Sequence, residues 1–259
     1  MHRLLVDGCA LGGGTAALPE ASRHHLKVLR PKEGEKVELF DGCGAWRVFE
    51  WKDGTLCAAG EIRRAERPVR RLWLFACVTK GSRWDWTIEK ATELGVSRIV
   101  PVISARTIVR VAEGEREAKR ARWTRVAEDA ARQSDAKWLP EVLAPVGFAE
   151  AVRMAAECEC YVGALSDPPP QDVLTEVLRG AGGDARSPSV PARSPGASGG
   201  SPRPLAVFVG PEGDFTPEEL AAVSAAATPV GFGPTILRAE TAAIYGLSVL
   251  KAFMDSHQP

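Results

Sequence analysis

The stretch VFVGPEGDFTPEEL, residues 207–220, decides the fold class of this 259-residue chain. Its β-branched and aromatic start predicts a buried strand over residues 205–209, and a Gly-Pro-Glu-Gly loop follows at 210–213. Thr216 and Glu219 have the spacing of a capping box, which marks the start of a helix. A glycine-bracketed loop between strand and helix is where parallel α/β sheets bind ligands, although an ordinary tight turn shows the same pattern.

A second segment of the same kind, GFGPTILRAETAA, occupies residues 231–243. It predicts a short strand over 230–232 and a final helix over 241–254 that is apolar nearly all round, and therefore buried in the core or against a partner. Arg238 and Glu240 stand at the entrance to that helix. A bound ligand would explain charges at the mouth of a buried helix, and a surface pair between the two is the simpler alternative.

The first 67 residues predict a small β-barrel. Short alternating runs are separated by Asp-Gly turns at 41–42 and 53–54, a pattern typical of β-hairpins. The expected strands cover residues 36–40, 45–51 and 56–62.

From residue 71 onward, strands and helices alternate, which predicts an α/β domain over 71–259 with a mostly parallel sheet covered on both faces. Within it, residues 180–204 consist almost entirely of Gly, Pro, Ser, Ala and Arg, and they predict a disordered insertion. The expected elements before the insertion are strands over 72–78 and 98–103 and helices over 83–94 and 113–134.

Composition excludes several classes of protein. No run of about 20 apolar residues could span a bilayer, and the apolar run before Asp7 is too short for a signal peptide, so we expect a cytoplasmic protein. The 6 cysteines are scattered and predict free thiols, and with 4 histidines they give no zinc-ligand spacing, so we expect no metal. Neither a strand-linked Gly-x-Gly-x-x-Gly nor a Gly-Lys-Ser/Thr loop is present, which argues against a dinucleotide or P-loop enzyme.

Charge is divided unevenly along a neutral chain. Residues 1–140 hold 26 of the 33 Lys and Arg residues but 19 of the 33 Asp and Glu residues. This basic half is consistent with a face that binds a polyanion such as RNA, and equally with a solvated surface.

The two loops, in this order near the C-terminus, resemble the cofactor site of the SPOUT RNA methyltransferases. Within that superfamily the chain resembles the ribosomal small subunit methyltransferase E family, which methylates N3 of a uridine in the decoding region of 16S rRNA. The motifs that carry the resemblance are Arg3 in the opening Met-x-Arg, HHL at 24–26 with VLR at 28–30, KGSR at 80–83, KATELGV at 90–96, QS at 133–134, GPEG at 210–213 and ILRAETA at 236–242.

This resemblance implies a PUA-like β-barrel followed by a SPOUT domain with a trefoil knot, a homodimer formed through the knot region, and S-adenosylmethionine (SAM) as cofactor. It implies a cofactor site made of Val209, Gly210, Pro211, Glu212, Gly213, Phe232, Gly233, Ile236, Leu237, Arg238, Thr241 and Ala242.

The resemblance also implies catalytic and RNA-binding residues. Arg238 is expected to stabilise charge on the uracil, and Glu240 to accept the N3 proton or to orient Arg238. Trp84 or Trp86 is a candidate for stacking on a base, the other being a core residue. Contacts to 16S rRNA in the small subunit are expected from Arg3, His24, Arg30, Lys80, Arg83, Lys90, Arg106 and Gln133.

Three positions depart from the family pattern. Asp214 stands where a second glycine is usual, Thr235 stands where arginine is usual, and Asp135-Ala136 replaces Gly-Arg, with Lys137 as the nearest substitute cation. The alternatives are a SPOUT methyltransferase for another RNA position and an RNA-binding dimer without catalytic activity. Binding of SAM separates the second of these from an enzyme.

Overall fold

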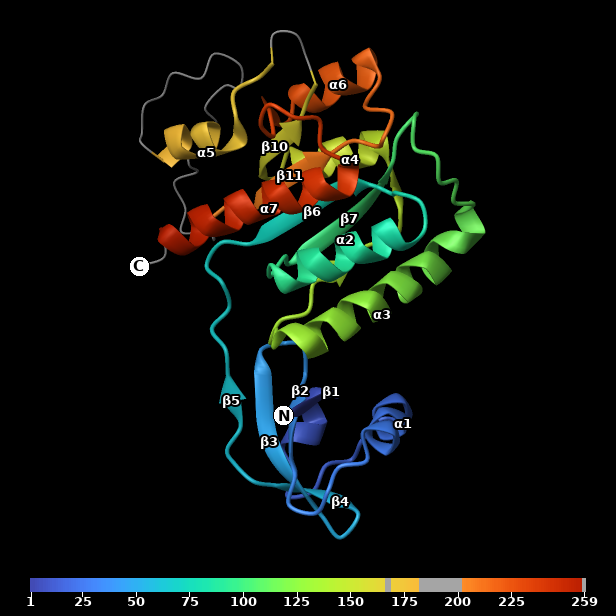
Figure 1. Cartoon of the computed structure of the whole chain (residues 1–259), viewed down its shortest axis with the longest axis vertical. Helices are drawn as coiled ribbons and strands as arrows, with labels where there is room; N and C mark the ends of the chain where they lie inside the picture. The colour runs from blue at the N-terminus through green and yellow to red at the C-terminus, as the bar shows by residue number, and fades with distance from the viewer. Residues whose placement is uncertain (166–168, 182–201, 258–259) are drawn as a thin grey trace. The chain divides into compact units, whose positions relative to one another are not determined.

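The computed structural model describes residues 1–165, 169–181 and 202–257 and divides the chain into two compact units (Figure 1). The first unit is Met1–Pro68 together with Ala127–Leu139, and the second is Val69–Val126 together with Pro140–Pro259. From the sequence, we expected residues 127–139 to belong to the 71–259 domain, whereas the structure groups them with the first unit. Most of the expected insertion at 180–204 lies outside the described residues.

The first unit is built on a five-stranded sheet. β1 (His2–Leu5) runs parallel to β2 (Lys36–Phe40), and antiparallel pairing then joins β2 to β3 (Ala45–Lys52) and β3 to β4 (Thr55–Ala58). β5 (Arg63–Arg64) pairs with the start of β3. The predicted hairpins are confirmed, although β4 ends at Ala58 and not at residue 62.

The turn between β3 and β4 follows from its sequence. Asp53 and Gly54 have φ values of 48° and 75°, and positive φ at both central residues is the geometry of the mirror-image turns that suit hairpins. A short 3-10 helix η1 (Gly8–Leu11) and helix α1 (Glu20–Leu29) complete the first 68 residues. The sequence did not predict α1, because this helix buries little more than Leu26 and has no side-chain cap at Pro19.

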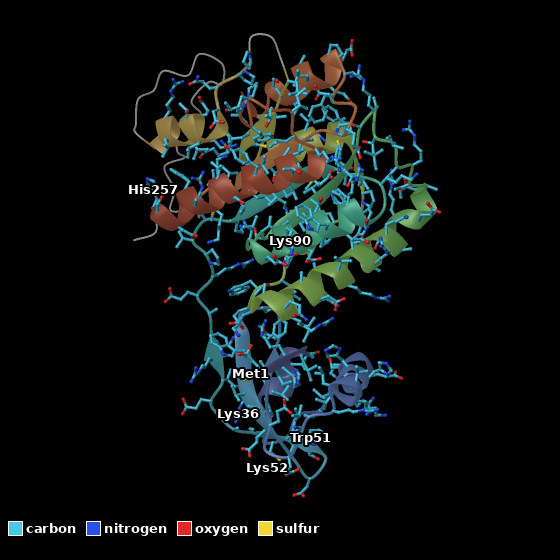
Figure 2. All side chains as sticks on the ribbon, viewed as in Figure 1. Met1, Lys36, Trp51, Lys52, Lys90 and His257 are labelled. Atoms are coloured by element: carbon cyan, nitrogen blue, oxygen red, sulfur yellow. The ribbon has the colours of Figure 1, made fainter. Side chains whose placement is uncertain are left out.

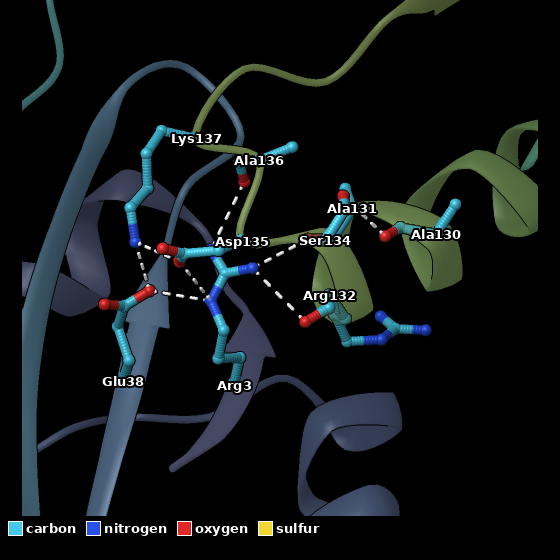
Figure 3. A network of polar contacts seen from close by, with 9 residues as sticks. All are labelled: Arg3, Glu38, Ala130, Ala131, Arg132, Ser134, Asp135, Ala136 and Lys137. Atoms are coloured by element: carbon cyan, nitrogen blue, oxygen red, sulfur yellow. Dashed lines mark hydrogen bonds and ion pairs between the residues drawn. The ribbon is translucent and has the colours of Figure 1, made fainter. Parts of the chain in front are cut away.

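An ion-pair network explains why 127–139 belongs to the first unit (Figure 3). The Arg3 side chain is 8% exposed, and its Nε donates to Glu38 Oε1 at 2.8 Å. Its other nitrogens donate to the carbonyl oxygens of Ala131, Arg132 and Ala136 at 2.7 to 3.2 Å. These carbonyls lie at and just after the C-terminus of α3 (Arg116–Ser134), where no intrahelical donor remains and where a cation is favoured.

The second unit contains a seven-stranded sheet in which every pair is parallel, as the sequence predicted. The strand order is β12 (Thr228–Val230), β10 (Glu159–Gly163), β11 (Leu205–Val209), β6 (Leu72–Cys77), β7 (Arg98–Ile103) and β8 (Glu141–Val142), with β9 (Val146–Gly147) also on β7.

Helices cover both faces of this sheet (Figure 1). α4 (Phe148–Ala155) and α6 (Pro217–Ser224) pack on the face that carries Phe75 and Phe208. α7 (Ala239–Ser256) lies on the other face, against β6 and β11, and is flanked by α2 (Ser82–Glu93) and α5 (Val173–Ala181). The predicted strands and helices occur here, with a 3-10 turn η2 (Glu113–Glu115) before α3.

Two predictions need correction. β12 covers 228–230, two residues before the predicted 230–232, because Pro229 is tolerated in this edge strand and the loop begins at Gly231. α7 is only partly buried in the core, since Thr241, Ser248 and Ala252 are exposed together with Tyr245, and burial of this side against a partner stays a prediction. These residues recur three to four positions apart and form one exposed stripe on the helix.

Candidate functional site

A cavity of about 550 Å³ lies at the carboxyl ends of three neighbouring parallel strands, β12, β10 and β11. Loops that follow the carboxyl ends of parallel strands are the usual ligand sites of open α/β sheets. The lining residues are Gly163, Ala164, Leu165, Pro169, Pro170, Val209, Gly210, Pro211, Glu212, Asp214, Gly231, Phe232, Gly233, Thr235, Ile236, Leu237, Arg238, Ala239 and Ala242.

The loop after β11 is fixed by the helix cap of α6 and by hydrogen bonds to the residues that follow β7. Thr216 caps α6 by accepting from the Glu219 amide at 3.2 Å, and Glu219 Oε2 accepts from the Thr216 amide at 3.2 Å. Glu219 Oε1 also accepts from the Ala105 amide, which follows β7. Arg106 Nη1 donates to the carbonyls of Gly213 and Phe215 at 2.9 and 3.2 Å. This arginine, expected to contact RNA, therefore fixes the Gly-Pro-Glu-Gly loop.

Asp214 shows why a glycine is expected at its position. Its φ is 58°, in the left-handed region, where Asp is among the few residues tolerated beside Gly. Its Oδ1 accepts from the Phe215 amide, which supports this conformation. The departure from the family pattern therefore keeps the loop geometry and adds a carboxylate to the cavity wall.

Phe232 forms one wall of the cavity and fits between two glycines. A Cβ at Gly163 would lie 2.3 Å from the Phe232 ring, and one at Gly246 would lie 3.3 Å from it and 2.8 Å from Val207. Tyr245 packs edge-on against the same ring at 5.9 Å. Glycine is therefore required at Gly163, because no other residue leaves room for the aromatic wall.

The expected catalytic residues lie at the start of α7. Arg238 is its N-cap residue and is exposed at the cavity edge, with no ion pair within the described residues. A cation is unfavourable at a helix N-terminus, so the helix itself gives no reason for this arginine. The Glu240 side chain is 11% exposed, and its nearest cation is Arg83, whose Nε lies 3.7 Å from Glu240 Oε1.

The cavity contains every residue predicted to bind a cofactor except Gly213 and Thr241. Gly213 packs on Arg106, and Thr241 is exposed on α7. Sequence reasoning missed the loop after β10, with Gly163, Ala164 and Leu165, because it has no recognisable motif. The one feature of the sequence that could have indicated this loop is the position of Gly163 at the carboxyl end of a buried strand.

The expected RNA contacts fall into two groups. In the first unit, His24, Arg30 and Gln133 are exposed, whereas Arg3 is buried in the network described above. In the second unit, Lys80 is exposed, and Lys90 on α2 donates to Glu89 and Glu93 at 2.8 Å (Figure 2).

The two tryptophans of α2 are also distinguished. Trp84 is buried and packs on Trp123, and Trp86 is 40% exposed. Trp86 is therefore the residue of the two that can stack on a base.

Other features concern metals, membranes and thiols. Across the described ranges, no three His, Cys, Asp or Glu side chains are grouped to hold a metal ion, and no helix is long and apolar enough to cross a membrane. All six cysteines are free, as predicted.

Lys137, the possible substitute cation, is 14% exposed and donates to Glu38 and Asp135 at 2.5 and 2.7 Å, so it is a structural ion-pair partner.

Comparison with known proteins gives the family. The model of the RNA methyltransferase domain family matches residues 65–251. The ribosomal RNA small subunit methyltransferase E of Mycobacterium bovis is 32% identical over 88% of this chain and 82% of its own length. The chain belongs to the ribosomal RNA small subunit methyltransferase E family.

Further proteins are similar to this chain over a comparable length. The Bacillus subtilis enzyme is 28% identical over 89% of this chain and 87% of its own length. The solved methyltransferase E of Neisseria gonorrhoeae, bound to SAM, superimposes with a TM-score of 0.75 at 26% identity, over 97% of each chain. A Legionella pneumophila protein solved with bound SAM gives a TM-score of 0.78 at 26% identity, again over 97% of each chain.

Proposed function

We propose that this chain transfers a methyl group from SAM to N3 of a uridine in the decoding region of 16S rRNA, on the small ribosomal subunit in the cytoplasm. One observation carries the proposal. The two motifs that mark the methyltransferase E family, at 210–213 and 236–242, meet around one cavity, and Arg238 stands at its edge. The alternatives of another RNA position and of a non-catalytic dimer have no observation of their own in their favour.

The cavity suits SAM by size and by chemistry. Its volume of about 550 Å³ is within the range of small-molecule sites, roughly 300–1,000 Å³. Most of its lining is apolar side chain and glycine backbone, and Glu212, Asp214 and Arg238 supply charges of both signs. SAM carries an ammonium, a sulfonium and a carboxylate, so both signs have a partner.

The chemistry divides between cofactor and protein. When bound, SAM supplies an activated methyl group. The residues of the chain must exclude water, align the uracil and help N3 lose its proton. Loss of that proton spreads negative charge onto the two flanking carbonyl oxygens.

Arg238 is the residue we assign to this charge. Its guanidinium is exposed at the cavity edge and is committed to no carboxylate in the parts of the chain that are described. A fixed cation beside a developing negative charge stabilises the transition state. Glu240 is two residues further along and is the carboxylate we propose as proton acceptor, or as the group that orients Arg238.

The RNA is bound by exposed basic and polar residues of both units. We propose that the first unit is a PUA-like barrel that contacts rRNA through His24, Arg30 and Gln133, with Arg3 holding the unit together. In the second unit Lys80 contacts phosphates, because such contacts supply most of the affinity for RNA. Lys90 contributes less, because Glu89 and Glu93 already offset its charge. Trp86 stacks on an unpaired base.

The second unit is proposed to form a trefoil knot and to dimerise through it. The resemblance of the motifs at 210–213 and 236–242 to the SPOUT methyltransferases supports the knot, and the loops after β11 and β12 that carry these motifs line one cavity. Exposed apolar side chains, Leu174 and Leu178 on α5 and Tyr245 on α7, supply a surface that a second copy would cover.

A methyl-transfer assay tests the proposal. Wild-type protein is incubated with labelled SAM and with either small or large ribosomal subunits from a strain that lacks the modification. Label in 16S rRNA of the small subunit, and none in the large subunit, supports the proposal. Label in neither subunit, or only in the large one, contradicts it.

A further inference from the structure

Arg83 occupies a particular place at the start of α2. Gly81 precedes the helix with a φ of 65° and a ψ of −136°, a conformation that favours glycine, and the chain bends there so that α2 begins at Ser82. Arg83 therefore lies in the first turn, and its side chain is 47% exposed. The resemblance to the methyltransferase E family implies that Arg83 contacts RNA.

The Arg83 guanidinium stands between two carboxylates from different elements. Its Nη1 is 3.8 Å from Glu212 Oε1, and its Nε is 3.7 Å from Glu240 Oε1. Both distances exceed hydrogen-bond length, so the arginine attracts both groups without being committed to either. Glu240 has a second oxygen, Oε2, that is fully buried and has no hydrogen-bond partner among the described residues.

One carboxylate lies in a motif loop of the cavity, and the other lies in the first turn of α7, directly after the second motif loop. Glu212 lines the cavity from the loop after β11. Glu240 directly follows Arg238 and Ala239, which line the cavity from the N-cap position and the first residue of α7. Arg83 thus lies between a carboxylate of the cavity wall and a carboxylate that adjoins the opposite wall. Arg83 belongs to α2, which contributes no residue to the lining.

The same surroundings make Arg83 a poor phosphate contact. Two acidic side chains within 4 Å offset its positive charge, whereas Lys80, three residues earlier, is exposed and has no ion pair in the described chain. A phosphate approaching Arg83 would have to overcome both carboxylates. Lys80 therefore provides a matched comparison.

We propose that Arg83 is a positioning residue that holds Glu212 and Glu240, and with them the two loops, in the geometry that binds the cofactor. This inference rests on the proposed function only in taking the cavity to be the SAM site. It assigns Arg83 to cofactor affinity and removes it from the set of phosphate contacts.

The test compares Arg83→Gln with Lys80→Gln, measuring the Kd for S-adenosylhomocysteine by calorimetry and the salt dependence of rRNA binding. Arg83→Gln should raise the Kd about three- to tenfold, as expected for two partly exposed ion pairs, with an unchanged salt slope. Lys80→Gln should leave the Kd unchanged and reduce the salt slope by about one. Arg83→Lys, which retains the charge but cannot span both carboxylates, should be intermediate.

A coupling measurement separates positioning from a general loss of structure. Once Glu240→Gln has removed one partner, adding Arg83→Gln should weaken binding less than it does in the wild type, and the melting temperature of Arg83→Gln should stay near the wild-type value. An unchanged Kd in Arg83→Gln with a reduced salt slope would overturn the proposal. Wild-type protein that binds no S-adenosylhomocysteine would instead contradict the cavity assignment itself.

Discussion

At the scale of single residues, the cavity depends on the fit of Phe232 between glycines. The Cβ that any other residue would add at Gly163 lies 2.3 Å from the ring, a distance that real side chains do not reach. The ring must then move into the cavity or rotate against Tyr245.

Gly163→Ala should therefore lower the free energy of unfolding by about 1–3 kcal/mol and weaken cofactor binding, because overpacking displaces the cavity wall. Denaturant unfolding and calorimetry measure the two effects. Gly114→Ala is the control, since an added Cβ there meets nothing within 4 Å. Equal behaviour of the two variants would show that Phe232 does not depend on Gly163.

For Arg238 we predict an effect on catalysis and none on stability, because the residue is exposed and has no ion pair among the described residues. Arg238→Ala should lower kcat about a hundredfold or more, the effect of removing one donor that stabilises transition-state charge, and should leave the melting temperature unchanged. Single-turnover kinetics with saturating SAM measure the chemical step. Undiminished turnover would remove Arg238 from the catalytic role.

The cysteines allow a test of burial. Burial raises the pKa of Cys77 to about 12 and that of Cys158 to about 12, so both remain neutral thiols up to well above pH 9 in the folded protein. Cys9 and Cys43 are exposed. At pH 8 a thiol reagent should modify Cys9 and Cys43 within minutes and reach Cys77 and Cys158 only after unfolding, because the thiolate is the reactive form. Mass spectrometry of the labelled peptides identifies each site, and fast labelling of Cys77 would contradict the buried environment.

At the scale of elements, hydrogen bonds and an ion pair of Arg3 hold the C-terminal end of α3 against the sheet of the first unit. Arg3 and Glu38 have side chains that are 8% and 6% exposed, and three backbone carbonyls of 131–136 accept from the arginine. Removing Arg3 leaves the buried Glu38 carboxylate with Lys137 as its one remaining cation in the described chain, and it leaves the three carbonyls without this donor.

Arg3→Met should therefore destabilise the first unit by about 3 kcal/mol, and Lys27→Met, at an exposed position of α1, should change stability by less than about 0.5 kcal/mol. Hydrogen exchange at β1 and at residues 127–134 should rise only in the first variant. If Arg3→Met melts like the wild type, the network contributes nothing to stability.

The sequence predicted the elements that bury continuous apolar runs. β7 and β11 begin and end where 98–103 and 205–209 were expected, because their central residues are buried on both faces of a parallel sheet. The motif loops at 210–213 and 236–242 marked two of the three sides of the cavity. The loop after β10 was missed, since glycine and alanine at 163–164 become informative only beside Phe232.

The acceptors of two arginines could not be predicted from the sequence, because each arginine bonds to residues far away along the chain. Nothing local shows that Arg3 pairs with carbonyls about 130 residues away, or that Arg106 donates to the loop at 213–215. Both arginines matched a family motif or a basic surface and were expected to bind RNA. Residue type identifies a cation, whereas only the fold shows which acceptor it meets.

At the scale of the whole molecule, the proposed dimer makes one prediction. Leu178 on α5 is 52% exposed, and a charge at this position would be buried if a second copy covers α5 and α7. Leu178→Glu should shift sedimentation from dimer to monomer, and Ile108→Glu, at a position 66% exposed, should not. A wild-type monomer at micromolar concentration would exclude the proposed assembly.

We propose that the protein methylates one uridine nitrogen in 16S rRNA with SAM bound in the cavity between the motif loops. The most direct measurement is nucleoside mapping by mass spectrometry after wild-type protein has acted on unmodified small subunits with SAM. We expect a single 3-methyluridine in the decoding region, and we expect it to be absent when Arg238→Ala is used. A methyl group on another base or at another position, or the same product from Arg238→Ala at the wild-type rate, would contradict it.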